Sequence, residues 1–168
     1  MVEVYLNNYL NLNWLRPENA LCQAIDAFYV RPHLNGSKIL EVGCGNGYFS
    51  FTMMGGELTQ DYDYYTYADI ANFYKNADIY DSFNGMNVAP LIRKAPKLKF
   101  SLGIDNKDSL LAQASRLDFY GSLLCKDLND GIGLKEPYFD AVFCNMLHWL
   151  RDPYGLLQGL GKVIVASG

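Results

Sequence analysis

Apolar residues recur along this chain with two different periods. Between residues 14 and 34 they are spaced as on one face of an α-helix, and Pro17 and Glu18 suit its first turn. A continuous apolar run over 38–42 then predicts a buried strand, which stops abruptly at a glycine-rich turn. Residues 48–54 can begin the next helix. The pattern therefore predicts a strand, a glycine turn and a helix in that order.

The remainder of the chain repeats the alternation of strand and helix. Strands are predicted over 98–104, 121–125 and 141–144, a helix over 109–117, and a last helix from Pro153 to Leu160. Strands that alternate with helices are joined by right-handed crossovers into a parallel sheet covered on both faces. The predicted fold class is therefore α/β, with flanking helices around a parallel sheet.

Residues 56–97 interrupt the alternation. They are crowded with tyrosine and aspartate and lie between the first helix and the second strand, so we interpret them as an insertion in a single domain of residues 1–168. Two interpretations stay open. Aromatic residues such as Tyr64 and Tyr65 form a lid that contacts the substrate, or they pack locally on a surface excursion whose aspartates are solvated.

Charge and cysteine usage narrow the class of partner. A formal net charge of -4 gives no broad basic surface, which predicts a small-molecule partner and no nucleic acid. No apolar run is long enough to span a bilayer and the first residues lack a signal-peptide pattern, so we expect a cytoplasmic protein without membrane contact. The four cysteines form no C-x-x-C pair and predict no metal site.

The glycine turn carries the first candidate chemistry. Gly43, Gly45 and Gly47 let the chain turn sharply out of a strand and let a ligand approach bare backbone, although a tight turn without a ligand is the alternative. Because carboxyl ends of neighbouring parallel strands line one crevice, we expect Asp105 and Asp127 beside this turn. Asp105 would accept hydrogen bonds from ribose hydroxyls, or would instead cap the helix that follows.

Four segments in the same order resemble the motifs of class I, Rossmann-like S-adenosylmethionine-dependent methyltransferases, in particular the type 11-like methyltransferase domain. They are ILEVGCGNGYFS, LGIDNKDSLLAQASRL, LLCKDLND and FDAVFCNMLHWLRDPYGLLQGLGKV. This resemblance implies a Rossmann-like sheet with the predicted strands in the order third, second, first, fourth. It also implies S-adenosylmethionine as cofactor and S-adenosylhomocysteine as product.

The resemblance implies roles for individual residues. The cofactor-binding residues would be Glu41, Gly43, Gly45, Gly47, Asp105, Asp127, Leu128 and Asn145. Among them Glu41 would anchor the motif and reach the methionine amino group through backbone or water. Asp127 would bind the adenine amine with Leu128 beside the ring, and Asn145 would face the methionine moiety and the acceptor.

Two residues after the fourth strand are candidates for the acceptor side of the site. His148 would remove a proton from the acceptor during methyl transfer, and Trp149 would contact the substrate. The alternative is that His148 binds backbone groups while Trp149 packs. Methyl transfer from a sulfonium requires mainly alignment of the reacting atoms, so the mechanism does not depend on a base.

The chain departs from the family pattern at two points. Asp105 follows the glycines much later than the roughly 20 residues usual in related folds, which the insertion explains. The family's sheet also has later strands for which few residues remain after the last predicted helix. We therefore expect a C-terminally truncated domain with its last strands missing. It would be either a fragment of a longer protein or a domain whose sheet is completed by a homodimer or a second chain.

The sequence thus predicts an enzyme that transfers a methyl group from S-adenosylmethionine to a small-molecule acceptor by in-line attack. One alternative is a non-catalytic fragment that binds the cofactor or a partner. A second is an NAD-dependent oxidoreductase, whose G-x-G-x-x-G spacing differs from the G-x-G-x-G spacing found here.

Overall fold

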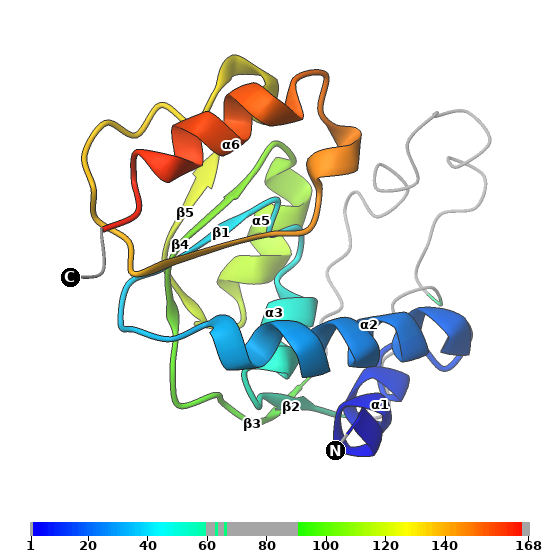
Figure 1. Cartoon of the computed structure of the whole chain (residues 1–168). Helices are drawn as coiled ribbons and strands as arrows, with labels where there is room; N and C mark the ends of the chain where they lie inside the picture. The colour runs from blue at the N-terminus through cyan, green and yellow to red at the C-terminus, as the bar shows by residue number, and fades with distance from the viewer. Residues whose placement is uncertain (1, 60–62, 64–65, 67–90, 166–168) are drawn as a thin grey trace. The chain divides into compact units, whose positions relative to one another are not determined.

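The computed structural model describes residues 2–59, 63, 66 and 91–165 (Figure 1). The chain divides into two compact units. The first unit contains residues 1–32 and 46–97, and the second contains residues 33–45 and 98–168. The break within the glycine turn places Gly43 and Gly45 in the second unit and Gly47 in the first. The single domain predicted over 1–168 stays a prediction.

The second unit is built on a parallel sheet. Its strands are β1 (Ile39–Val42), β4 (Phe100–Asp105), β5 (Tyr120–Cys125) and β6 (Ala141–Cys144). They lie in the order β5-β4-β1-β6, and each neighbouring pair is parallel. The predicted α/β class and the strand order third, second, first, fourth are confirmed. All four residues of β1 are buried, as expected for a central parallel strand covered on both faces.

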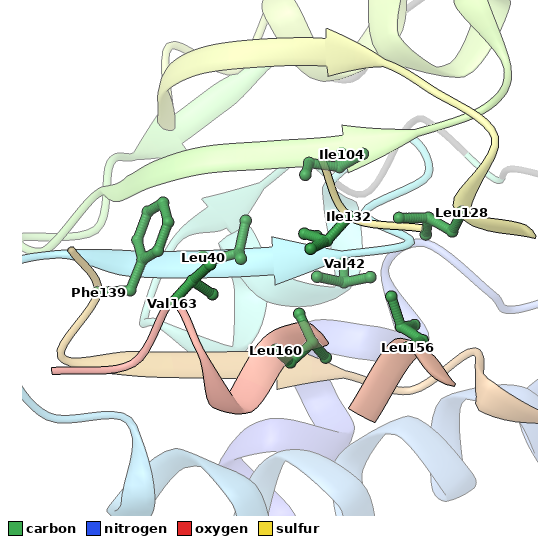
Figure 2. Close-up of a cluster of buried hydrophobic side chains, with 9 residues drawn as sticks. All are labelled: Leu40, Val42, Ile104, Leu128, Ile132, Phe139, Leu156, Leu160 and Val163. Carbon is green, nitrogen blue, oxygen red and sulfur yellow. The ribbon is translucent and has the colours of Figure 1, made fainter. Parts of the chain in front are cut away.

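A helix and a hydrophobic cluster cover one face of this sheet. The helix α6 (Pro153–Gly161) begins at Asp152, whose side chain accepts a hydrogen bond from the Gly155 N–H group. The cluster in Figure 2 joins β1 and β4 to α6 and consists of Leu40, Val42, Ile104, Leu128, Ile132, Phe139, Leu156, Leu160 and Val163. The burial of these side chains packs α6 against the sheet.

Pairing continues at the outer side of β6. After α6, Ile164 forms a parallel bridge with Phe139, and the Val165 N–H group donates to the Phe139 carbonyl at 2.9 Å. The start of one more strand therefore lies beside the entry to β6. The expected completion of the sheet by strands from elsewhere stays a prediction.

Another helix of the second unit connects β4 to β5. It is α5 (Asp108–Ser115), and its buried side chains include Leu110, Leu111 and Ala114. The helix follows Asp105 directly, so the strand end and the helix start are held together. This crossover brings the carboxyl ends of β4 and β5 to the same edge of the sheet.

Among its described residues, the first unit contains three α-helices and a small antiparallel sheet. The helices are α1 (Val2–Leu10), α2 (Pro17–Val30) and α3 (Tyr48–Met53), and the strands are β2 (Glu57–Leu58) and β3 (Ile92–Lys94). In its core Tyr9 is fully buried, stacks on Phe49 at 5.6 Å between ring centroids, and donates its hydroxyl to the Phe49 carbonyl at 2.9 Å. The sequence pattern predicts α2 and α3 but misses α1.

The strands β2 and β3 close the base of the segment interpreted as an insertion. The Thr59 N–H group donates to the Leu91 carbonyl, and the Leu91 N–H group donates to the Thr59 hydroxyl. Within the segment, buried Asp63 accepts a hydrogen bond from the Leu15 N–H group at 3.0 Å. Tyr64 and Tyr65 lie outside the described residues, so the predicted lid stays a prediction.

None of the helices that the structure describes has the length and apolar character needed to cross a bilayer.

Candidate cofactor site

The glycine turn after β1 has a backbone that only glycine adopts readily. Gly43, Gly45 and Gly47 have φ angles of 77°, 55° and 76°, all in the left-handed region. A Cβ atom on Gly43 would also lie 2.2 Å from the Cγ atom of Met146. A Cβ atom on Gly45 would meet nothing within 4 Å. Gly43 is therefore required by packing against the loop after β6, whereas Gly45 leaves its backbone open to a ligand.

Hydrogen bonds tie this turn to the end of β4. The N–H groups of Gly43 and Cys44 both donate to the Ile104 carbonyl, at 2.8 and 3.0 Å. The next donor, the Gly45 N–H group, reaches the side chain of Asp105 at 2.9 Å. The turn and the predicted ribose-binding carboxylate thus form one connected structure.

Asp105 is held by backbone donors on two sides. Its Oδ2 atom accepts from Gly45, its Oδ1 atom accepts from the Lys107 N–H group at 3.0 Å, and the residue is 9% exposed. A carboxylate has about four lone-pair sites, so each oxygen keeps capacity for a ligand hydroxyl. The two interpretations of Asp105 are therefore compatible, because the residue orders the start of α5 and also faces the turn.

Asp127 lies beyond β5 at the same edge of the sheet. The Lys126 N–H group donates to the Asp105 carbonyl at 2.8 Å, which joins the two strand ends. The Asp127 carboxylate accepts from the backbone and side-chain amides of Asn129, both at 2.9 Å. These bonds, followed by the positive charges of Arg151 and Lys126, lower the pKa of Asp127. The side chain is exposed and ionised, as a hydrogen-bond acceptor for a ligand amine requires.

Leu128 follows Asp127 but points into the core. It begins the short 3-10 helix η4 (Leu128–Asp130), is 5% exposed and belongs to the cluster that α6 covers (Figure 2). The structure does not group Leu128 with the exposed candidates. Its predicted place beside the adenine ring stays a prediction.

The loop after β6 presents the remaining candidates. Asn145, His148 and Trp149 are exposed, the last two in the 3-10 helix η5 (Leu147–Trp149). The rings of His148 and Trp149 lie 5.3 Å apart between centroids, and Trp149 is 65% exposed rather than packed. The Arg151 N–H group donates to the Asn129 side chain at 3.0 Å, which links this loop to the one carrying Asp127.

Two residues of this region were missed by sequence reasoning. Asn129 joins both loops at the sheet edge, and Tyr120 donates its hydroxyl to Glu41 at 2.7 Å. The Asn129 contact had a visible signal, since an aspartate side chain often accepts a hydrogen bond from the backbone two residues further on. The Tyr120 contact had none, because the partner is 79 residues away in the sequence.

The electrostatic character of the site comes from buried carboxylates. Burial raises the pKa of the Cys44 thiol, and the charges of Glu41 and Asp105 raise it further. Cys44 is therefore a neutral thiol and a poor nucleophile. The base of the glycine turn carries negative charge, which suits a ligand with a cationic group.

A separate cavity of about 460 Å³ lies in the first unit. Its lining comes from α1, the end of α2, α3 and the small sheet, and includes Tyr5, Phe28 and Met53. None of the predicted site residues that the structure describes lines it. This cavity therefore does not belong to the candidate cofactor site.

The parallel sheet and the glycine turn connected to Asp105 form a Rossmann-like α/β unit with the predicted cofactor-binding residues at the carboxyl ends of its strands. The chain is 33% identical over 145 residues to ribosomal RNA small subunit methyltransferase G of Shewanella pealeana. The match covers 85% of this chain and 56% of that protein, so the chain spans little more than half the length of this relative. The similarity confirms the resemblance to methyltransferases, a class that uses S-adenosylmethionine as methyl donor. No protein-family model matches the chain.

Two solved structures show weaker likeness. A chain from a complex of the Haloferax volcanii Trm112 methyltransferase activator has a TM-score of 0.49 at 13% identity, covering 99% of this chain and 52% of that one. The S-adenosylhomocysteine-bound Podospora anserina methyltransferase PaMTH1 has a TM-score of 0.46 at 16% identity, covering 89% and 50%. Neither likeness is close enough to support a functional conclusion.

The prediction of a small-molecule partner and no nucleic acid is wrong. The relative named above is a ribosomal RNA methyltransferase, which points to a nucleic-acid substrate. The physical reason for the error is that a net charge sums over the whole chain. Phosphate contacts require only a local group of lysine and arginine residues, and a chain with a negative total can carry one.

Proposed function

We propose that this chain is the cofactor-binding part of an enzyme that transfers a methyl group from S-adenosylmethionine to ribosomal RNA. The observation that carries the proposal is the connected geometry of the glycine turn and Asp105, in a chain 33% identical to a ribosomal RNA methyltransferase. The acceptor class is taken from that relative and from a basic segment described below, and a separate experiment tests it.

The residues of the site would act mainly by binding and orientation. The open backbone at Gly45 would receive the cofactor, and Asp105, already oriented by two N–H groups, would accept the ribose hydroxyls. Exposed Asp127 would accept the adenine amine. Bound in this way, the sulfonium methyl group would face the loop of Asn145 and His148, where alignment and exclusion of water favour in-line attack.

A basic segment before β4 supports a polynucleotide acceptor. Arg93, Lys94, Lys97 and Lys99 are all exposed, and two of them form ion pairs, Lys94 with Glu57 and Lys99 with Asp118. The carboxyl end of β4 lies roughly 20 Å along the strand from Lys99, at about 3.3 Å per residue. A polynucleotide is long enough to contact both ends of such a strand, whereas a small molecule is not.

The first experiment tests the cofactor. The purified chain is titrated calorimetrically with S-adenosylhomocysteine, with NAD as the competing ligand and Asp105→Ala as the site variant. We expect binding of S-adenosylhomocysteine alone and its loss in Asp105→Ala, with Asp26→Ala, an exposed aspartate on α2, as the matched control. Binding of NAD instead, or no binding by a folded sample, would contradict the proposal.

The second experiment tests the acceptor. Transfer of a labelled methyl group is measured with small-subunit ribosomal RNA, transfer RNA and a mixture of metabolites. We expect label in ribosomal RNA, and weaker RNA binding with a shallower salt dependence when Arg93 and Lys97 are both changed to alanine. Cofactor binding without transfer to any of them would favour a non-catalytic cofactor-binding fragment.

A further inference from the structure

Tyr120 and Glu41 form a buried pair across the centre of the sheet. Tyr120 begins β5 and Glu41 lies in β1, and β4 runs between those two strands. Nevertheless the Tyr120 hydroxyl donates to the Glu41 Oε2 atom at 2.7 Å, with the two residues 9% and 3% exposed. A hydrogen bond that skips a strand requires a long side chain and an open path over the strand between.

Gly103 provides that path. It lies in β4 and pairs with Glu41 on one side and Leu123 on the other. A Cβ atom on Gly103 would lie 2.9 Å from both Cδ1 and Cε1 of the Tyr120 ring, so the ring passes directly over this glycine. Glycine within a strand weakens it, and close approach of another group is the usual reason for finding one there. The Tyr120 ring supplies this reason.

The pair lies next to the glycine turn. Leu40 and Val42 face the α6 cluster (Figure 2). Successive side chains of a strand point to opposite faces, so Glu41 faces the other side of the sheet, the side of its partner Gly103. From Glu41 the chain reaches Gly43 in two residues. The negative charge of Glu41 also acts on the thiols of Cys44 and Cys144, which places the carboxylate close to the ends of β1 and β6.

We propose that Tyr120, lying over Gly103, is a positioning residue that orients the Glu41 carboxylate toward the cationic methionine part of the cofactor. This inference rests on the proposed function. Burial and the adjacent Glu41 charge raise the pKa of Tyr120, so its hydroxyl stays protonated and remains a donor at neutral pH. A donor held in this way fixes the carboxylate and stabilises its charged form.

The test separates the two ends of the cofactor. Tyr120→Phe removes only the hydroxyl, and its affinity is measured by calorimetry for S-adenosylhomocysteine and for methylthioadenosine, which lacks the amino-acid part. We expect Tyr120→Phe to weaken S-adenosylhomocysteine binding by roughly ten- to a hundredfold and methylthioadenosine binding by much less. Tyr138→Phe, which removes a hydroxyl from an exposed tyrosine of the same unit, is the matched control.

The pH dependence gives a second readout. Without its donor the charged form of the Glu41 carboxyl is less stabilised, so the affinity of Tyr120→Phe for S-adenosylhomocysteine should fall more steeply than that of the wild type as the pH is lowered below neutrality. The Glu41 charge acts on Tyr120, Cys44 and Cys144, and Asp105 acts on Tyr120 and Cys44; both thiols stay neutral because their pKa values are raised. The wild type should show a flatter profile over the same range.

Each outcome has a distinct meaning. Equal weakening of both ligands in a folded Tyr120→Phe variant, or no weakening, overturns the positioning role but leaves the proposed function intact. A wild-type chain that binds neither ligand overturns the proposed function itself. If Tyr120→Phe does not fold, Glu41→Gln replaces it, and the inference requires the same selective loss of S-adenosylhomocysteine binding.

Discussion

Asp105 and Asp127 hold corresponding positions at the ends of neighbouring strands, yet their surroundings differ. Asp105 is 9% exposed and its two oxygens accept backbone N–H groups from two separate segments. Asp127 is exposed, and in the described part of the chain its carboxylate accepts hydrogen bonds from Asn129, two residues along the chain. Asp105 links two segments of the tertiary structure, whereas Asp127 is held by a local turn.

The comparison shows that residues at corresponding positions of a motif can contribute very differently to the stability of the fold. A buried carboxylate must keep its donors, because an unpaired charge in the interior is strongly unfavourable. An exposed carboxylate is solvated with or without its partners. Changes at Asp105 should therefore affect folding and binding together, whereas changes at Asp127 should affect binding almost alone.

The largest expected effect comes from Asp105→Ala. It leaves the Gly45 and Lys107 N–H groups without this acceptor, so the free energy of unfolding should fall by about 3 kcal/mol. Urea unfolding followed by circular dichroism measures this loss. If the variant were as stable as the wild type, the hydrogen bonds of Asp105 would not stabilise the fold more than those of Asp127.

Asp127→Ala should show the opposite balance. We expect S-adenosylhomocysteine affinity to fall by roughly tenfold, while the urea midpoint changes far less than in Asp105→Ala. Calorimetry and the same unfolding experiment measure the two quantities. A variant that binds as tightly as the wild type would show that Asp127 does not contact the cofactor.

Asn129→Ala tests whether the local turn needs its partner. Asn129 orients Asp127 and also accepts from the Arg151 N–H group, so we expect a loss of about 0.5 to 1 kcal/mol in unfolding free energy and a smaller loss of affinity than in Asp127→Ala. Comparing the two variants in one calorimetric series checks the order. The reverse order would place Asn129, rather than Asp127, against the ligand.

The smallest effect concerns pH. The hydrogen bonds from Asn129 lower the pKa of Asp127 below its ordinary value of 3.8, so the stabilisation they give is complete above that value and is lost as the pH falls through the lower folded pKa. An NMR titration of the Asp127 carboxyl carbon measures the midpoint. In Asn129→Ala the midpoint should rise, and an unchanged midpoint would contradict the assigned cause.

Much of the fold could be predicted because it is encoded locally. The apolar runs that became β1, β4, β5 and β6 are short and end at glycine or aspartate, and alternation with helices limits them to a parallel sheet. The helix α1 escaped prediction because its apolar residues are interspersed with Asn7 and Asn8, and its helical state depends on packing in the first unit.

The candidate site could also be predicted where its geometry is set by residue type and strand order. The left-handed turn at Gly43 and Gly45 follows from the residue type, and its closeness to Asp105 follows from the parallel arrangement of β1 and β4. The burial of Leu128 does not follow from any motif, because it depends on where α6 lies on the sheet. The acceptor class was misjudged because total charge does not describe local charge.

By itself the sequence determined the order of strands and helices, the glycine turn and the carboxylates at the strand ends, because periodicity and backbone sterics act over a few residues. Only the tertiary structure decided that Tyr120 reaches Glu41. That contact joins residues 79 positions apart and depends on β4 lying between β1 and β5 with a glycine at the crossing point. No local sequence pattern specifies this contact, because it forms only when the strands are packed side by side.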